Sequence, residues 1–247
     1  MKPFKFILSA MAVFMAAPFF QSCLDDDDND YSLFFPTAMV TVKNIPDGGI
    51  YLQEDANTTL FPVNLTKSPY NGKVVRAIVN YSDTDADAHG FTKAVQVHWI
   101  DSILTKNTVP TLGTEEDIAK YGNNPVEIRN DWYTVCEDGY LTLRFLTLWG
   151  NIGVTHSVNL ITGVNPENPY EVHFAHNQFN DNVFLEKDGI VAFDLSSLPD
   201  TNGETVKLKL TWNSFSGEKS AEFDYCTSKA SGNPQALISD NQSKSLK

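Results

Sequence analysis

The alternation of apolar and polar residues along most of the chain is typical of β-strands. In residues 205–212 every second residue from Val206 to Trp212 is apolar, and lysine or threonine stands between. Residues 73–81 place Val75 and Ala77 on one face with Arg76 on the other, and residues 93–100 place Val95, Val97 and Trp99 together. The same pattern predicts strands at 37–43, 50–53, 59–61, 73–81, 93–100, 132–135, 140–145, 156–161, 170–175, 189–195, 205–212 and 219–225.

Turn and cap residues punctuate this pattern. Asp138-Gly139 between two alternating runs predicts a hairpin. Thr114 is a candidate N-cap, acidic residues follow it at 115–117, and Gly122 is a stop signal, which together predict a short helix.

The spacing of these elements predicts an all-β protein of two domains. Five strands and the short helix in residues 31–129 suit an OB-like small barrel. About seven strands with frequent turns in residues 130–228 suit an antiparallel β-sandwich. The polar tail 229–247 is expected to be flexible.

The first 23 residues have the layout of an export signal. Lys2 and Lys5 precede an apolar run over 6–20, which is short for a spanning helix, and Ser22 stands directly before Cys23. This layout resembles a loose bacterial lipobox of the kind found in Bacteroidetes lipoproteins. The resemblance implies that a signal peptide, residues 1–22, is removed, and that Cys23 then carries diacylglyceryl and N-acyl chains such as palmitate, anchoring the protein in the outer membrane. A secreted protein with an incidental cysteine is the alternative.

The acidic segment 23–30 follows the anchor. Like charges without apolar residues predict a solvated tether. Acidic residues after the lipidated cysteine also resemble the surface-export signal of Bacteroidetes lipoproteins, which implies exposure at the cell surface. A calcium trap is the weaker interpretation, because nothing fixes the ligand geometry.

Net charge limits the kinds of molecule that the protein can bind, and the cysteine count limits the possible disulfides. The chain has 18 basic and 31 acidic residues, a net charge of −13, which disfavours nucleic acid and permits cationic peptides. If Cys23 is lipidated, Cys136 and Cys226 remain as an even pair, either bonded as a disulfide or free.

Histidines and acidic residues predict neither a metal nor a cofactor. The run Asp83 to Asp87 begins like a calcium loop but lacks the later ligands, so we expect a solvated hairpin loop. His173 and His176 are three apart on a strand and should face opposite sides. His156 is expected to be a hydrogen-bonded core or edge histidine.

Exposed tryptophans are candidates for a carbohydrate or peptide platform. Trp132, Trp149 and Trp212 are the candidates, with Trp149 the best exposed and Trp212 assigned to the core. No phosphate loop, nucleophile elbow or HExxH motif occurs, so we expect a protein that is not an enzyme, although paired carboxylates keep a glycan hydrolase open.

Several segments in order carry a family resemblance. They are the lipobox with its acidic run, VQVHWIDSILTK at 95–106, DWY at 131–133 leading to GYLTL at 139–143, the histidine strand 156–161, and YEVHFAHN at 170–177. Together they resemble the NigD-like lipoproteins of Bacteroidetes. The resemblance implies an OB-like domain followed by a β-sandwich, and an association with bacteriocin genes. It supplies no catalytic motif.

The sequence thus predicts a surface-anchored, non-enzymatic binding or accessory module. Its expected partners are the membrane, through the anchor, and a cationic peptide, a protein or a glycan. The alternatives are a bacteriocin immunity factor and, less favoured, a glycan hydrolase.

Overall fold

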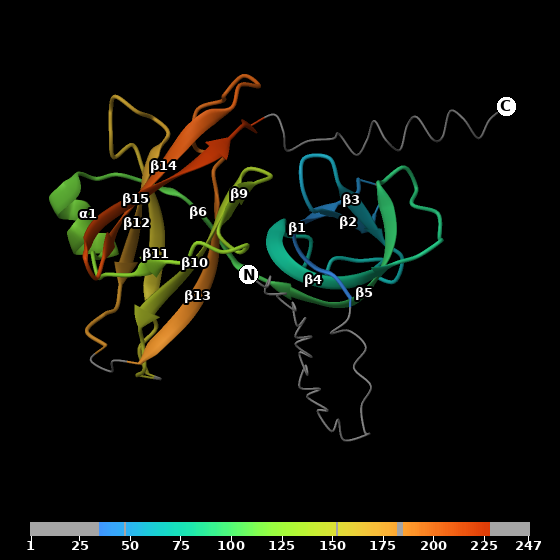
Figure 1. Cartoon of the computed structure of the whole chain (residues 1–247), viewed down its shortest axis with the longest axis horizontal. Helices are drawn as coiled ribbons and strands as arrows, with labels where there is room; N and C mark the ends of the chain where they lie inside the picture. The colour runs from blue at the N-terminus through green and yellow to red at the C-terminus, as the bar shows by residue number, and fades with distance from the viewer. Residues whose placement is uncertain (1–34, 47, 152, 182–184, 228–247) are drawn as a thin grey trace, which may run out of the picture. The chain divides into compact units, whose positions relative to one another are not determined.

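The computed structural model describes residues 35–46, 48–151, 153–181 and 185–227. The expected signal segment 1–22, Cys23, the rest of the tether 23–30 and the tail 229–247 lie outside them. The described residues form fifteen strands and one helix, which confirms the all-β prediction (Figure 1). The two domains described below belong to one compact unit.

The first domain is a closed five-stranded barrel, as predicted. Its strands follow the order β1-β2-β3-β5-β4, and the parallel pair of β3 and β5 joins its two halves. Alternate residues of every strand fill its interior with aliphatic side chains and Tyr81. The strands are β1 (Thr37–Asn44), β2 (Ile50–Gln53), β3 (Thr59–Pro62), β4 (Val75–Asp83) and β5 (Lys93–Ser102).

A β-bulge changes the faces of β5. The pairing with β4 shifts, so that Tyr81 lies opposite Val97 but Asn80 lies opposite Trp99, which leaves one extra residue on β5. An extra residue reverses the alternation beyond it. Val97 therefore lies in the core while Trp99 is 39% exposed, and the prediction that Trp99 shares the face of Val97 is wrong.

The second domain is a sandwich of two five-stranded sheets. One sheet has the order β6-β13-β10-β8, with β9 also paired to β10, and the other has the order β15-β14-β12-β11-β7. The apolar faces of the two sheets meet in one core that includes Leu141, Phe174 and Trp212. The strands are β6 (Leu104–Asn107), β7 (Val109–Pro110), β8 (Glu127–Ile128), β9 (Val135–Glu137), β10 (Tyr140–Leu148), β11 (Ser157–Thr162), β12 (Glu171–Asn177), β13 (Glu186–Asp194), β14 (Val206–Ser214) and β15 (Gly217–Tyr225).

The sandwich is mixed rather than purely antiparallel, which corrects the expectation. β12 and β14 are parallel because the strand between them in sequence, β13, lies in the other sheet. β6 and β7 also pair in parallel, with β13 and β11. The predicted Asp138-Gly139 hairpin is confirmed: β9 and β10 are antiparallel, and both turn residues have positive φ, 50° and 77°.

The border between the domains differs from the expected one at 129/130. β6, β7 and β8, which lie within 104–128, pair with sandwich strands, so the sandwich begins after Ile103. These strands have two to four residues each, too short for periodicity to assign them to a sheet.

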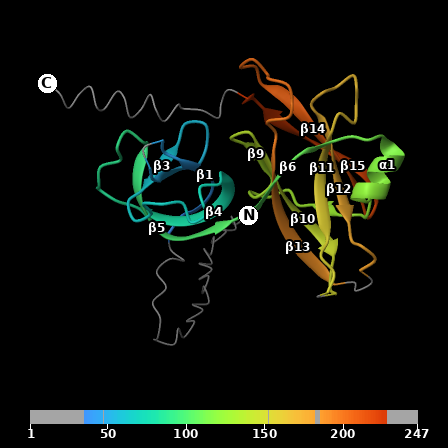
Figure 2. The same cartoon turned by 180° about the vertical axis from the view of Figure 1, so that it is seen from behind.

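The predicted short helix also belongs to the sandwich. Figures 1 and 2 show α1 (Thr114–Tyr121) outside the sheet that contains β11 and β12. Tyr121 packs there against Ile161 and Ala175. The N-cap is Gly113, without a side-chain bond, rather than Thr114. Asp117 instead accepts hydrogen bonds from the Leu112 amide and the Thr111 hydroxyl, which ties the helix to its preceding loop.

Candidate functional site

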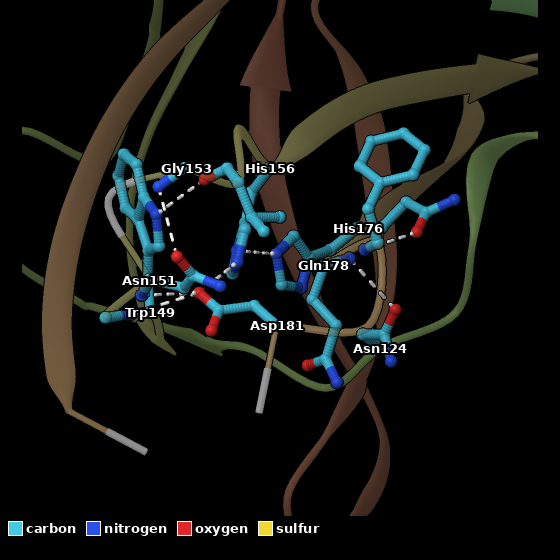
Figure 3. A network of polar contacts seen from close by, with 12 residues as sticks. Asn124, Trp149, Asn151, Gly153, His156, His176, Gln178 and Asp181 are labelled. Carbon is cyan, nitrogen blue, oxygen red and sulfur yellow. Dashed lines mark hydrogen bonds and ion pairs between the residues drawn. The ribbon is translucent and has the colours of Figure 1, made fainter. Parts of the chain in front are cut away.

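Two histidines and an aspartate form a buried chain of polar contacts at one end of the sandwich (Figure 3). His156, which directly precedes β11, has its Nδ1 2.9 Å from Nε2 of His176 on β12. Its Nε2 lies 3.2 Å from Oδ2 of Asp181, in the loop after β12. That oxygen also accepts the backbone N–H groups of Gly150 and Asn151, each at 3.1 Å. The chain therefore connects two loops to a core strand.

The hydrogen-bond partners decide how protons are arranged in this chain. An ionised Asp181 accepts the Nε2 proton of His156, so neutral His156 offers its Nδ1 lone pair to Nε2–H of His176. Nδ1 of His176 then holds a lone pair, and it is buried without a hydrogen-bond partner among the described residues. With both rings neutral, His176 donates to His156 and His156 donates to Asp181, so each of these two contacts has one donor and one acceptor.

Burial controls the charge of His176, which is 1% exposed. Burial lowers its pKa to about 4, with the neighbouring His156 adding to the effect. His176 is therefore neutral at physiological pH.

Trp149 covers this chain instead of standing free. Its ring stacks on His156 with centroids 5.2 Å apart, and its Nε1 donates to the Val154 carbonyl at 3.2 Å. Lys187 Nζ lies 5.8 Å from the Trp149 ring centre. The prediction that Trp149 is the best exposed tryptophan is wrong: Trp132 is 51% exposed, whereas Trp212 is buried in the core as predicted.

The hydrogen-bonded residues Asp181, His156 and His176 tie two loops to β12. An aspartate that orients a histidine is also the geometry of a catalytic triad, yet a triad needs a nucleophile on the far side of the histidine. Here the far side is a second imidazole, and no hydroxyl or thiol of the described residues bonds to either ring. The rings also touch directly, so a metal could not enter between them without moving them apart.

The remaining sequence-predicted residues can now be placed. His173 and His176 face opposite sides of β12 as predicted: His173 bonds Thr211 on the outer face, while His176 lies beside Phe145 of the core. His156 is the expected hydrogen-bonded histidine. Asp83 is the last residue of β4, and residues 84–87 lie in the connection between β4 and β5. In the described ranges, no group of three or more His, Cys, Asp or Glu residues is arranged to hold a metal ion.

A second feature is the acidic groove where barrel and sandwich meet, which we call the junction groove. Its volume is about 340 Å³, and Asp55, Glu137, Asp138 and Asp224 line it without any lysine or arginine. A neighbouring hollow of about 280 Å³ shares Asp55 and Glu137 with it and adds Glu54 and Trp132. Only the tertiary fold reveals this cluster, because its acids come from three separate places in the sequence, 54–55, 137–138 and 224.

Two basic residues behind the groove hold the domains together. Lys43 Nζ lies 2.7 Å from Oδ1 of Asp138. Arg76, whose side chain is fully buried, donates from Nη1 to Thr41 and has Nη2 3.9 Å from Glu137. Burial raises the pKa of Glu137, and Arg76 opposes that rise. Glu54 also has a raised pKa, chiefly through burial.

The two cysteines of the described domains line this same groove. No disulfide joins Cys136 and Cys226 in the structure. Burial raises the pKa of the Cys136 thiol to about 12, so little reactive thiolate forms. The disulfide stays a prediction, and their place in one groove is compatible with it.

Sequence reasoning missed Asp181 and the four groove acids. An aspartate in a polar loop carries no local signal of burial, and acids distant in sequence carry none of proximity. Among the described residues no helix is long and apolar enough to cross a membrane.

Comparison with known proteins gives a consistent result across both domains. The family model of the NigD-like N-terminal OB domain matches residues 39–103, and that of the NigD-like C-terminal beta sandwich domain matches residues 107–225. These limits agree with a border after Ile103. No curated protein matches the chain.

Three crystal structures share the fold. A protein from Parabacteroides distasonis described as a "putative toxin related protein" is 33% identical, with a TM-score of 0.67 over 83% of this chain and 98% of that one. A NigD-like immunity protein from Bacteroides caccae is 18% identical, with a TM-score of 0.55 over 78% and 97%. A "putative lipoprotein" from Bacteroides fragilis is 14% identical, with a TM-score of 0.53 over 78% and 99%.

Both domain models match in order and together cover more than half of the chain, with the OB barrel and sandwich each in its place. The chain therefore belongs to the NigD-like family.

Proposed function

We propose that this protein is a lipoprotein anchored through Cys23 in the outer membrane and exposed at the cell surface. We propose further that it is a non-enzymatic module that binds a cationic partner. The junction groove carries this proposal, because four carboxylates line it and no basic residue does. The anchor is supported by the lipobox-like sequence and by the relative described as a lipoprotein.

The groove suits a cationic group for electrostatic reasons. Lys43 and Arg76 lie behind it, and Lys207 beside it pairs with Asp224 at 2.7 Å. These three basic residues leave Asp55 in the groove and Glu54 in the neighbouring hollow without an ion pair among the described residues. Glu54 and Glu137 have raised pKa values because burial disfavours their ionised forms. A bound cation would favour those ionised forms, so its affinity should increase as pH rises through their titration.

Trp132 adds a surface for the partner. It is 51% exposed, stacks on Tyr133 with centroids 3.8 Å apart, and lines the hollow beside Glu54 and Glu137. An exposed tryptophan next to carboxylates can hold a lysine or arginine side chain through cation–π contact.

Binding is tested with the mature protein and a lysine-rich peptide, measured by calorimetry at two salt concentrations. We expect saturable, salt-sensitive binding that falls about tenfold in Trp132→Ala and in the double variant Glu54→Gln, Glu137→Gln. The control is Asp85→Asn with Asp87→Asn, the same charge change in an exposed loop of the barrel. Equal binding by the groove variant and the loop variant would show that peptide binding depends only on the net charge of the protein, and it would overturn the proposal.

The anchor has its own test. Cys23→Ala should lose metabolic labelling by palmitate and leave the membrane fraction, while protease added to intact cells should degrade the unaltered protein. Full protection from that protease would place the protein on the periplasmic side.

A bacteriocin immunity role is the second candidate, favoured by the structural similarity to a NigD-like immunity protein from Bacteroides caccae. Expression of this protein in a sensitive strain would then protect it from killing, and Cys23→Ala would lose that protection. Unchanged killing would exclude immunity against the bacteriocin tested without touching the binding proposal.

A further inference from the structure

A pocket on the outer face of the sandwich lies apart from the features above. Its floor is a row of paired residues across three strands, Ile161 on β11, His173 on β12 and Thr211 on β14. Its wall is the face of α1 that carries Thr114, Asp117 and Ile118. The volume is about 280 Å³, and all its residues belong to the sandwich.

The shortness of α1 keeps the pocket open. The helix has eight residues and packs on β11 and β12 through Tyr121. It leaves the outer face of β15 exposed, where Glu218 stands at the pocket rim.

The polar atoms of the pocket include more free acceptors than free donors. The Thr211 hydroxyl donates to the Val172 carbonyl, so its oxygen accepts Nδ1–H of His173 at 2.9 Å, and Nε2 of His173 is left as an acceptor. Asn213 donates its amide N–H to the Asn123 carbonyl, which leaves its side-chain oxygen. In the described part of the chain, neither His173 Nε2 nor the Glu218 carboxylate has a hydrogen-bond partner.

The other carboxylates of the pocket are already engaged. Asp117 accepts from Thr111 and Leu112, and Glu171 accepts from Asn165 and Lys209. Burial lowers the pKa of His173, while Glu218 and Asp117 oppose that shift from nearby. A neutral imidazole among three carboxylates, with no lysine or arginine in the lining, makes this pocket negative.

Apolar groups complete the pocket. Ile161 is buried in the floor, Val164 lines the side, and Ile118 of the helix is 48% exposed. These apolar side chains can contact a short alkyl chain whose polar end reaches His173 Nε2 and the Glu218 carboxylate.

We infer that this pocket binds an alkylammonium group, such as a lysine side chain, with the ammonium between His173 Nε2 and the Glu218 carboxylate and the alkyl chain along Ile118 and Ile161. Three N–H donors of an ammonium match the unpaired acceptors, and its charge matches the carboxylates. This site goes beyond the proposed function, since it shares no residue with the junction groove.

The test uses the mature chain and small probes, read by the imidazole nitrogen signals of His173 in NMR. N-acetyl-lysine amide should shift the His173 Nε2 signal saturably, and N-acetyl-norleucine amide, which lacks the ammonium, should bind at least tenfold more weakly. Glu218→Gln should weaken the lysine probe about tenfold. Equal binding of both probes would overturn the inference.

The matched control is Glu222→Gln, an exposed acid on the same face of β15 and outside the pocket. Equal loss of binding in Glu218→Gln and Glu222→Gln would mean general attraction to the acidic surface and would also overturn the inference.

Two further probes show whether the alkylammonium group that binds belongs to a polypeptide or to a free amine. Tighter binding of a lysine peptide than of 1,5-diaminopentane would identify a polypeptide, and the reverse a free amine.

Discussion

Some polar residues are buried although the alternation pattern places them on the outer face of a strand. Arg76 lies on the face of β4 opposite the barrel core, as predicted, and Asn80 lies on the same face. Both are buried, at 0% and 2% exposed. Arg76 is covered where β4 meets the sandwich, its backbone N–H bonding the Thr105 hydroxyl. Asn80 donates to the Phe35 carbonyl. Alternation assigns a face, but what covers that face depends on distant residues.

His176 should make stability depend on pH. Its folded pKa of about 4 lies below the unfolded value of about 6.5, so the unfolded chain binds the proton more readily. Its contribution is complete above pH 6.5 and is lost as pH falls towards 4, up to about 3 kcal/mol. Urea unfolding between pH 7 and 4 measures this.

The variant His176→Gln isolates that contribution, because a glutamine amide can donate to His156 but does not titrate. Its free energy of unfolding should fall less between pH 7 and 4 than that of the unaltered protein. His98→Gln, at an exposed position of β5, should keep the full dependence. Identical slopes in all three proteins would contradict the assignment.

At the scale of elements, strand positions followed from the pattern but pairing did not. Eleven of the twelve strands expected from alternation are found, most with ends shifted by one to three residues. The strand expected at 132–135 is mostly a turn, and β9 begins only at Val135. The bulge in β5 and the parallel pairing of β12 with β14 depend on partners elsewhere in the chain. The acidic first turn and Gly122 predict the helix, but nothing in the sequence indicates that it packs on β11 and β12.

Gly122 fixes how α1 meets β12. Its φ is +82°, and a Cβ there would lie 2.5 Å from the His176 carbonyl oxygen. Gly122→Ala should therefore cost roughly 2 kcal/mol or more, combining left-handed strain with a backbone clash. Thermal unfolding of the full chain measures this loss.

Gly139→Ala is the matched control. Its φ is similar, +77°, but a Cβ there meets nothing within 4 Å. It should cost only about 1 kcal/mol, the strain alone. Equal losses in the two variants would show that the contact with β12 is not tight.

At the scale of the whole molecule, the linking segment decides the domain border. Residues 104–128 supply β6, β7 and β8, which add to the two sheets of the sandwich, and α1, which packs on β11 and β12. Nothing in their short pattern indicates that role. The junction groove arises at the same border, from acids of the barrel and of the sandwich.

The border predicts how fragments behave. A fragment of residues 104–227 should unfold cooperatively, since it retains both complete sheets. A fragment of 130–227 loses three strands and α1 and exposes the edges of β13 and β11, so it should be unfolded or aggregate. Circular dichroism with urea titration distinguishes the two, and equal stability would contradict the topology.

The sequence indicated some residues of the candidate sites, but not which residues the fold brings together. It identified His156 as hydrogen-bonded and the opposite faces of His173 and His176, because both follow from local periodicity. It did not identify Asp181 as their partner or Trp149 as their cover, since each comes from a loop placed by the fold. It identified acidity as a property of the chain, but not the groove that concentrates it.

Local information is enough to establish the family, the two β domains and most strands, because side-chain alternation and turn residues act over a few neighbouring positions. The export signal and the lipidation of Cys23 remain predictions from the sequence, because both lie outside the described residues. Register, parallel pairing, the domain border, the polar chain and both acidic pockets were decided by tertiary structure. Each depends on contacts between residues that lie far apart in the sequence, and no short stretch of sequence encodes which distant segment will lie against it.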